Sequence, residues 1–186
     1  KSLLYSEAII QNIGTNVIPV ESMNEVYVSS KKNGDNTTSD TVFTTEHIDG
    51  PFWFLKGVSL FRVILAINDS DMYTTKITQK KMSITLSKGD LIGFDFNRSS
   101  HLIEKNVNSV TTNDRIVLKL HYLKYSKETW TMYIYFAIMC NILYDRIARQ
   151  LFLYTLEPKS FLQRRTADLI LFITKFWNKW NTLRNE

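Results

Sequence analysis

The chain has 186 residues, of which 44% are hydrophobic and 22% are charged, so it suits one globular domain with an appendage rather than a disordered segment. Its net charge of +5 is uneven: residues 1–126 hold 14 Lys/Arg against 13 Asp/Glu, and residues 127–186 hold 9 against 5. The nearly neutral first part gives little support for nucleic-acid binding, and we expect none. The single cysteine, Cys140, excludes a four-cysteine zinc site and favours an intracellular, reducing location.

Up to about residue 125 the apolar residues fall in short runs that are rich in Val, Ile, Thr and aromatics and are separated by polar turn residues. This pattern is typical of an all-β domain. It predicts strands over Val26–Ser29, Phe43–Asp49, Val58–Asn68, Met82–Ser87, Asp90–Phe96 and Arg115–Tyr125. The polar residues 30–40 predict a mobile loop just before the first candidate metal ligand.

After about Ser126 the character of the chain changes, since glycine disappears and long apolar stretches follow. We predict helices over Glu128–Leu156 and Phe161–Arg184, divided at Pro158. The domains are therefore predicted as 1–126, all-β, and 127–186, a helical tail. The apolar run from Trp130 to Tyr144 is shorter than the roughly 20 residues that a bilayer crossing needs.

The second predicted helix carries an apolar stripe at helical spacing: Leu169, Phe172, Ile173, Phe176, Trp177 and Trp180. Basic residues surround it, so residues 160–184 could lie on a membrane surface. Docking on the chain's own domain or on a second subunit is the other interpretation, and the oligomeric state stays open.

Three residues predict a metal site. His47 and Asp49 lie two positions apart in a predicted strand, so their side chains point to the same face, and Gly50-Pro51 ends that strand. His101 follows another apolar strand and can supply the third ligand. Two imidazoles and one carboxylate leave open positions on the metal, as in the non-haem Fe(II) oxygenases. Those positions are where O2 can bind.

In this order and spacing the sequence resembles the 2-oxoglutarate/Fe(II) oxygenase superfamily, which includes prolyl hydroxylases and phytanoyl-CoA hydroxylase. The resemblance runs from about Val26 to Tyr125, and the segment KGDLIGFD resembles the usual lead-in to the distal histidine. It implies a mainly-β fold, a double-stranded β-helix (jelly-roll, cupin-like), here with a C-terminal α-helical appendage. It also implies Fe(II), 2-oxoglutarate and O2, with hydroxylation of an unidentified substrate and release of succinate and CO2.

The resemblance places the 2-oxoglutarate-binding basic residue at Arg115, with Lys119 on the same strand face as the fallback. On that face His121 is expected to be a packed or hydrogen-bonded histidine rather than a ligand. Arg62 interrupts an apolar strand and either faces solvent or contacts an anion.

Polar residues near His101, namely Asp95, Asn97 and Arg98, are candidates to orient its imidazole, although turn polarity explains them equally well. Three interpretations of the aromatic run 52–54 stay open: it lines a substrate pocket, it packs in the core, or it contacts the tail. Two alternatives to the oxygenase remain: an inactive relative that serves as an interaction module tethered by its helices, and a cupin-like metal enzyme that uses no 2-oxoglutarate.

Overall fold

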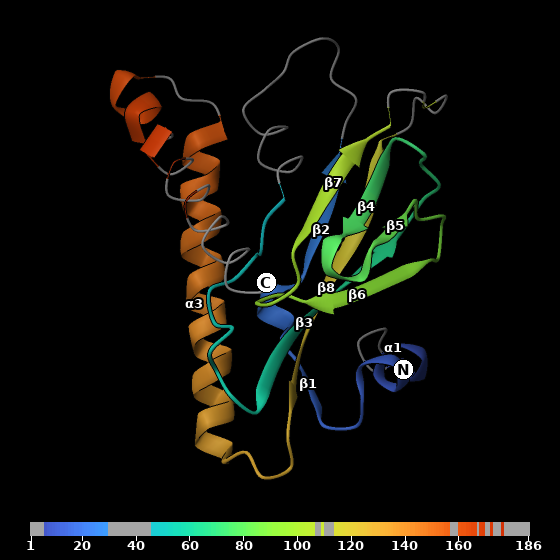
Figure 1. Ribbon diagram of the computed structural model, residues 1–186, viewed down its shortest axis with the longest axis vertical. Helices are drawn as coiled ribbons and strands as arrows, with labels where there is room; N and C mark the ends of the chain where they lie inside the picture. The colour runs from blue at the N-terminus through green and yellow to red at the C-terminus, as the bar shows by residue number, and fades with distance from the viewer. Residues whose placement is uncertain are drawn as a thin grey trace.

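The computed structural model describes residues 6–29, 46–106, 109, 114–156, 160–166, 168, 169, 172 and 176. Two antiparallel sheets form most of it, and a long C-terminal helix runs along one side of them (Figure 1). The prediction of a mainly-β fold with a C-terminal helix is therefore confirmed.

The five-stranded sheet is organised around β8 (Arg115–Tyr125). On one side β8 pairs with β3 (Val58–Ala66), which pairs with β6 (Leu91–Asp95). On the other side it pairs with β1 (Val17–Pro19) and with β2 (Glu25–Ser29). The register of β3 and β8 sets Arg62 opposite His121.

The three-stranded sheet has the order β5 (Met82–Ile84), β4 (Tyr73–Ile77), β7 (His101–Lys105). Its register sets Ile77 opposite His101. Short 3-10 helices, η2 (Glu21–Met23) and η3 (Thr78–Lys80), join the strands.

Three buried apolar clusters hold these layers together. One lies between the two sheets and contains Ile64, Ala66, Ile77, Leu86, Ile92, Phe94 and Val117. The second joins the five-stranded sheet to α3 (Thr131–Leu156) and contains Val20, Met23, Leu55, Val58, Leu60, Phe96, Leu123, Ile134 and Ala137. In the third cluster, Ile9 and Ile13 of α1 (Glu7–Ile13) pack against Val63, Leu120 and Tyr122 of the five-stranded sheet. Strand β8 is consequently buried on both faces at residues 119–123.

The predicted strands correspond to β2, β3, β5, β6 and β8, with ends that differ by up to three residues. The predicted strand Phe43–Asp49 is wrong over its described part, because residues 46–49 form only an isolated bridge at His47. Residues 43–45 and the predicted loop 30–40 lie outside the described residues. The sequence patterns did not predict α1, β1, β4 and β7.

The first predicted helix is α3, which begins three residues later than expected. Residues 161–166, 168, 169, 172 and 176 are helical, and the remainder of the second predicted helix lies outside the described residues. In the part of the chain that is described, no helix has both the length and the apolar character that crossing a membrane requires. The domain division at residue 126 stays a prediction.

Candidate metal centre

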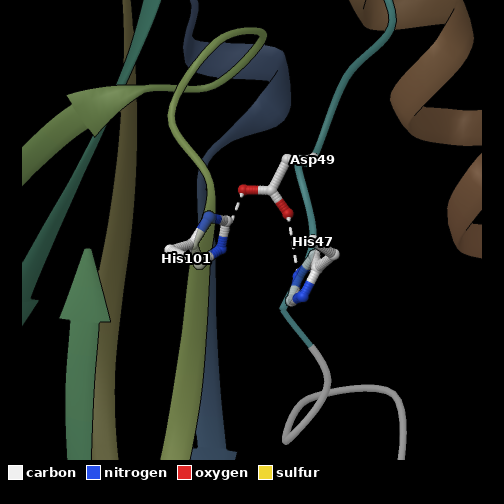
Figure 2. A group of neighbouring side chains, drawn as sticks. All are labelled: His47, Asp49 and His101. Atoms are coloured by element: carbon white, nitrogen blue, oxygen red, sulfur yellow. Dashed lines mark ion pairs between the residues drawn. The ribbon is translucent and has the colours of Figure 1, made fainter. Parts of the chain in front are cut away.

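His47, Asp49 and His101 meet between β7 and the segment that precedes β3, with their ligand atoms all within 4.8 Å of one another. Figure 2 shows the Asp49 carboxylate between the two imidazoles. Its Oδ1 lies 3.6 Å from Nε2 of His47, and its Oδ2 lies 3.4 Å from Nε2 of His101. The two rings have centroids 4.5 Å apart. The structure thus brings together the three residues that the sequence suggested.

Backbone contacts fix both histidines. The amide of each donates to the carbonyl of the other, at 2.9 Å in both directions. Just beyond Asp49, the Gly50 amide donates to the Phe96 carbonyl at 3.0 Å. A Cβ at Gly50 would lie 2.2 Å from Oδ1 of Asn97 and 2.6 Å from the Phe96 ring, so a side chain there would collide with both. The close approach of this segment to Phe96 therefore depends on glycine.

The His101 ring is buried and held in one orientation. Its Nδ1 lies 3.2 Å from the carbonyl oxygen of Ser99, and its face packs against Phe94 at a centroid distance of 4.4 Å. A carbonyl only accepts, so Nδ1 carries the proton of the neutral ring and donates it to Ser99. The lone pair of Nε2 then faces Asp49. This is how metal-binding histidines are commonly oriented.

The charges at the site favour a neutral His101 and an ionised Asp49. Burial lowers the pKa of His101 to about 4, despite the opposing effect of the Asp49 carboxylate. Burial alone would raise the pKa of the Asp49 carboxyl, but Arg62, followed by the two histidines, holds it well below its usual range. Arg62 Nη1 donates to Asp49 Oδ2 at 2.7 Å. Both groups are therefore in the protonation state that a divalent cation requires.

Arg62 is itself fixed deep between the sheets. Its Nε donates to Nε2 of His121 at 2.9 Å, and its guanidinium lies 4.6 Å from the centre of the Phe96 ring. Because an arginine donates only, Nε2 of His121 must be the unprotonated nitrogen, and Nδ1 carries the proton. That Nδ1 is buried and has no hydrogen-bond partner among the described residues. Burial lowers the pKa of His121 to about 2.

The two predicted co-substrate residues lie further along β8. Arg115 is buried, and its Nη2 donates to Thr75 Oγ1 at 3.3 Å. Burial lowers the pKa of this guanidinium, and within the described residues it forms no ion pair. Lys119 instead bonds Glu25 Oε1 at 2.9 Å and lies over the Tyr27 ring. Burial, followed by the neighbouring cation Arg62, lowers the pKa of Lys119 to about 7.

Helix α3 is fixed against the sheets at two points. Near its middle, the buried Asn141 accepts a hydrogen bond from Nδ2 of Asn97 at 3.0 Å, while Oδ1 of Asn97 accepts from the Phe52 amide at 3.1 Å. Two helical turns further on, Arg149 forms an ion pair with Glu25, the partner of Lys119. These two contacts fix the register of the helix against the metal-ligand segment on one side and against β2 on the other.

Between these two anchors, α3 presents polar and aromatic groups to the site. Tyr144 packs edge-on against Phe52, with centroids 5.9 Å apart. Asp145 is partly buried, and burial raises the pKa of its carboxyl while Arg62 opposes that rise. The aromatic run that follows the metal ligands is therefore divided: Phe52 contacts the helix, whereas Phe54 is largely exposed.

The donor set suits a divalent transition metal. Two imidazole nitrogens and one carboxylate, all within 4.8 Å of one another, are the donor types that non-haem Fe(II) centres use. Arg62 bonds Oδ2 of Asp49, so Oδ1, which lies beside Nε2 of His47, is the oxygen better placed to bind a metal monodentately. His121 is not part of the group, in agreement with the expectation that it is a hydrogen-bonded strand histidine.

Of the two interpretations of Asp95, Asn97 and Arg98, turn polarity holds, because the contact to the His101 ring comes from the backbone of Ser99. Arg98 instead bonds Asp95 and the carbonyls of Trp53 and Leu55, so it organises the turn that follows the metal ligands. Arg62 is buried rather than solvent-facing. Its position inside an apolar strand was the signal that identified it.

The sequence patterns did not predict the partners that lie far away along the chain: Thr75, Glu25, Asn141 and Arg149. Each of these contacts depends on how the sheets and α3 pack together. Polar residues look the same in a sequence whether or not they form such a contact. Asn141 alone carried a signal, because it is an amide within an otherwise apolar helical run.

Comparison with known proteins gives little further information. No family model matches the sequence, and no curated protein matches it. Among solved structures, a cupin protein from Bacteroides fragilis is similar with a TM-score of 0.32 and 13% identity, covering 64% of this chain and 76% of that chain. A TM-score this low carries no argument about the function of this chain.

Proposed function

We propose that this chain is an Fe(II)- and 2-oxoglutarate-dependent dioxygenase with a double-stranded β-helix fold. It oxidises 2-oxoglutarate to succinate and CO2 with O2 and places one oxygen atom in a C–H bond of its substrate. The observation that carries the proposal is the convergence of His47, Asp49 and His101, with the lone pair of His101 Nε2 facing the shared centre. Bound iron supplies the activation of O2.

The residues around the ligands prepare the site for that metal. Arg62 keeps Asp49 ionised and orients it, and the Ser99 carbonyl sets the tautomer of His101. Phe94 and Phe96 surround the site with apolar surface. A dry environment strengthens each of these electrostatic contacts and limits the access of water to the reacting centre.

Arg115 supports the proposed use of 2-oxoglutarate. Its guanidinium reaches Thr75, which lies two residues along β4 from the position opposite His101, or about 7 Å at the rise of a strand. A buried guanidinium without an acidic partner among the described residues is suited to a carboxylate. A five-carbon diacid has its two carboxylates separated by a distance of this order. Lys119 is less suited, because Glu25 already pairs with it.

Anaerobic titration tests the proposal. Metal-free protein is titrated with Fe(II) and then with 2-oxoglutarate, while the weak visible charge-transfer band of a chelated keto acid is recorded. We expect the band in the wild type and in His121→Gln, and its loss in His101→Gln. The two variants replace buried histidines with the same side chain, so their difference isolates the ligand role. A band that persists in His101→Gln contradicts the assignment.

The same titration separates the two alternatives. Fe(II) binding without a band when 2-oxoglutarate is added supports a cupin-like metal enzyme that uses another substrate. Absence of metal binding supports the inactive interaction module. Of the contacts at the site, the Arg62–Asp49 ion pair is the one that most favours the inactive interaction module, because it satisfies the carboxylate without a metal.

A further inference from the structure

Helix α3 is apolar on two opposite sides, and only one of them is covered. The side that faces the sheets carries the buried Ile134, Ala137 and Asn141. The outward side carries large apolar residues that are 44–62% exposed: Met132, Tyr135, Phe136, Met139, Leu143, Ile147 and Leu151. We call these seven residues the outer face. They recur at helical spacing over 20 residues, or about 30 Å.

An outer face of this size marks a binding surface. Exposed apolar patches on monomeric proteins rarely exceed a few hundred Å², and larger ones mark contacts with proteins or membranes. The described residues of the C-terminal segment do not cover it, because Phe161, Leu169, Phe172 and Phe176 are themselves 57–75% exposed. Two apolar surfaces in the same tail therefore lack a covering partner among the described residues.

Charge indicates what the partner is. On the outer side of α3 the charged side chain is Arg146, and no acidic residue lies there, since Asp145 is on the side of the metal centre. The exposed Arg164 and Arg165 follow in the tail, which has 9 basic against 5 acidic residues. A second copy of this chain would oppose Arg146 with another cationic surface. An anionic surface complements it.

The aromatic residues agree with a lipid partner. Tyr135, on the outer face, is 60% exposed, and Trp130, which immediately precedes α3, is 72% exposed. Tryptophan and tyrosine are enriched where protein meets the headgroup region of a bilayer, because each has an apolar body and a polar tip. Apolar side chains flanked by cations and aromatics define a helix that lies in the membrane interface.

We propose that the outer face of α3 docks on an anionic lipid bilayer and lies parallel to it. This inference is independent of the metal chemistry. The opposite side of the same helix contacts Asn97 and Glu25 through Asn141 and Arg149. Docking therefore places α3 between the lipid and the sheets.

Vesicle flotation of the full chain tests this. The vesicles contain phosphatidylcholine alone, or phosphatidylcholine with about one third phosphatidylserine. We expect the protein to float with the anionic vesicles, and to bind the neutral ones about tenfold more weakly. High salt should reduce the difference. Failure to float with either vesicle overturns the proposal.

Matched variants locate the contact. Met139→Glu with Leu143→Glu places two charges on the outer face, and Val26→Glu with Val28→Glu places two charges on exposed positions of β2. Both pairs change the net charge equally. We expect flotation to be lost in the first pair and kept in the second, with unchanged far-UV circular dichroism in both. Equal flotation of the two pairs overturns the proposal.

Light scattering without lipid gives a second readout. We expect the molar mass of wild type and of both variant pairs to be the same. A wild-type dimer that becomes monomeric in the variant of Met139 and Leu143 assigns the outer face to a second copy of the chain and overturns the lipid proposal.

Discussion

The buried His121 should make the metal-free protein sensitive to acid. Arg62 donates to its Nε2, so protonation of the ring would place two cations against each other away from water. Burial lowers the pKa of His121 from 6.5 to about 2. The unfolded chain therefore binds a proton below pH 6.5 that the folded chain does not bind. The contribution of the neutral His121 to the free energy of unfolding is fully present above pH 6.5. It is lost progressively as the pH drops from 6.5 toward 2.

The size of this loss follows from the pKa values. At pH 5, 1.5 units below the unfolded pKa, His121 lowers the unfolding free energy by about 2 kcal/mol, at about 1.4 kcal/mol per unit. His101, with its pKa lowered to about 4, contributes a similar amount in the metal-free protein. Together they amount to about 4 kcal/mol, a large part of the stability of an ordinary domain.

Replacing His121 by Gln isolates its share. The amide oxygen of Gln can accept the Arg62 hydrogen bond without titrating. Urea unfolding, followed by tryptophan fluorescence in a chelator, should show that the loss between pH 7.5 and pH 5 is about 2 kcal/mol smaller in His121→Gln than in the wild type. Tyr122→Phe, at the next buried position of β8, is the control and should keep the wild-type pH dependence. An unchanged loss in His121→Gln would refute the reasoning.

Three further changes test the site. His101→Ala should abolish tight Fe(II) binding in anaerobic calorimetry while circular dichroism shows the fold intact. Arg115→Met should weaken 2-oxoglutarate binding to the iron-loaded protein about 100-fold, since a charge-assisted contact is lost; if Lys119→Met has that effect instead, the roles are reversed. Gly50→Ala should lower the unfolding free energy by about 1–3 kcal/mol and weaken iron binding, because its Cβ meets Asn97 Oδ1 at 2.2 Å; urea unfolding that matches the wild type would contradict this.

The residues of the site could be predicted from local patterns. His47 and Asp49 lie two apart, so they share a side of any extended segment, whether or not it pairs as a strand. This explains why the error over Phe43–Asp49 left the site unaffected: residues 46–49 have one bridge, yet the two side chains still converge. Strand β8 was equally predictable, because its apolar residues Ile116, Leu118, Leu120 and Tyr122 recur at every second position, which is the spacing of a strand.

The missed strands have a physical explanation as well. Strand β4 reads YTTKI and begins with three polar or partly polar residues, so its apolar content is too low to distinguish it from a loop. Strand β7 begins at His101 and ends in the charged Glu104 and Lys105. Both belong to the smaller sheet, where one face is half exposed. Pairing between them, rather than composition, makes them strands.

The electrostatics of the site depended on tertiary packing and could not be predicted. Arg62 was visible as a cation in an apolar strand, but its partner could have been solvent, an anion or a carboxylate. The register of β3 against β8 sets it opposite His121, and the bridge at His47 brings Asp49 within 2.7 Å of it.

The polar groups form a layer between two apolar clusters, one between the sheets and one beneath α3. Leu60 belongs to the cluster beneath the helix and Ile64 to the cluster between the sheets, and Arg62 lies between them on the same strand face. A strand optimised only for stability would carry an apolar residue there, because a buried ion pair rarely stabilises more than well-packed hydrophobic groups. The layer instead keeps Asp49 ionised and in place. An ionised carboxylate held beside two imidazoles is what a cation site needs, and this is why the proposed metal chemistry is placed here.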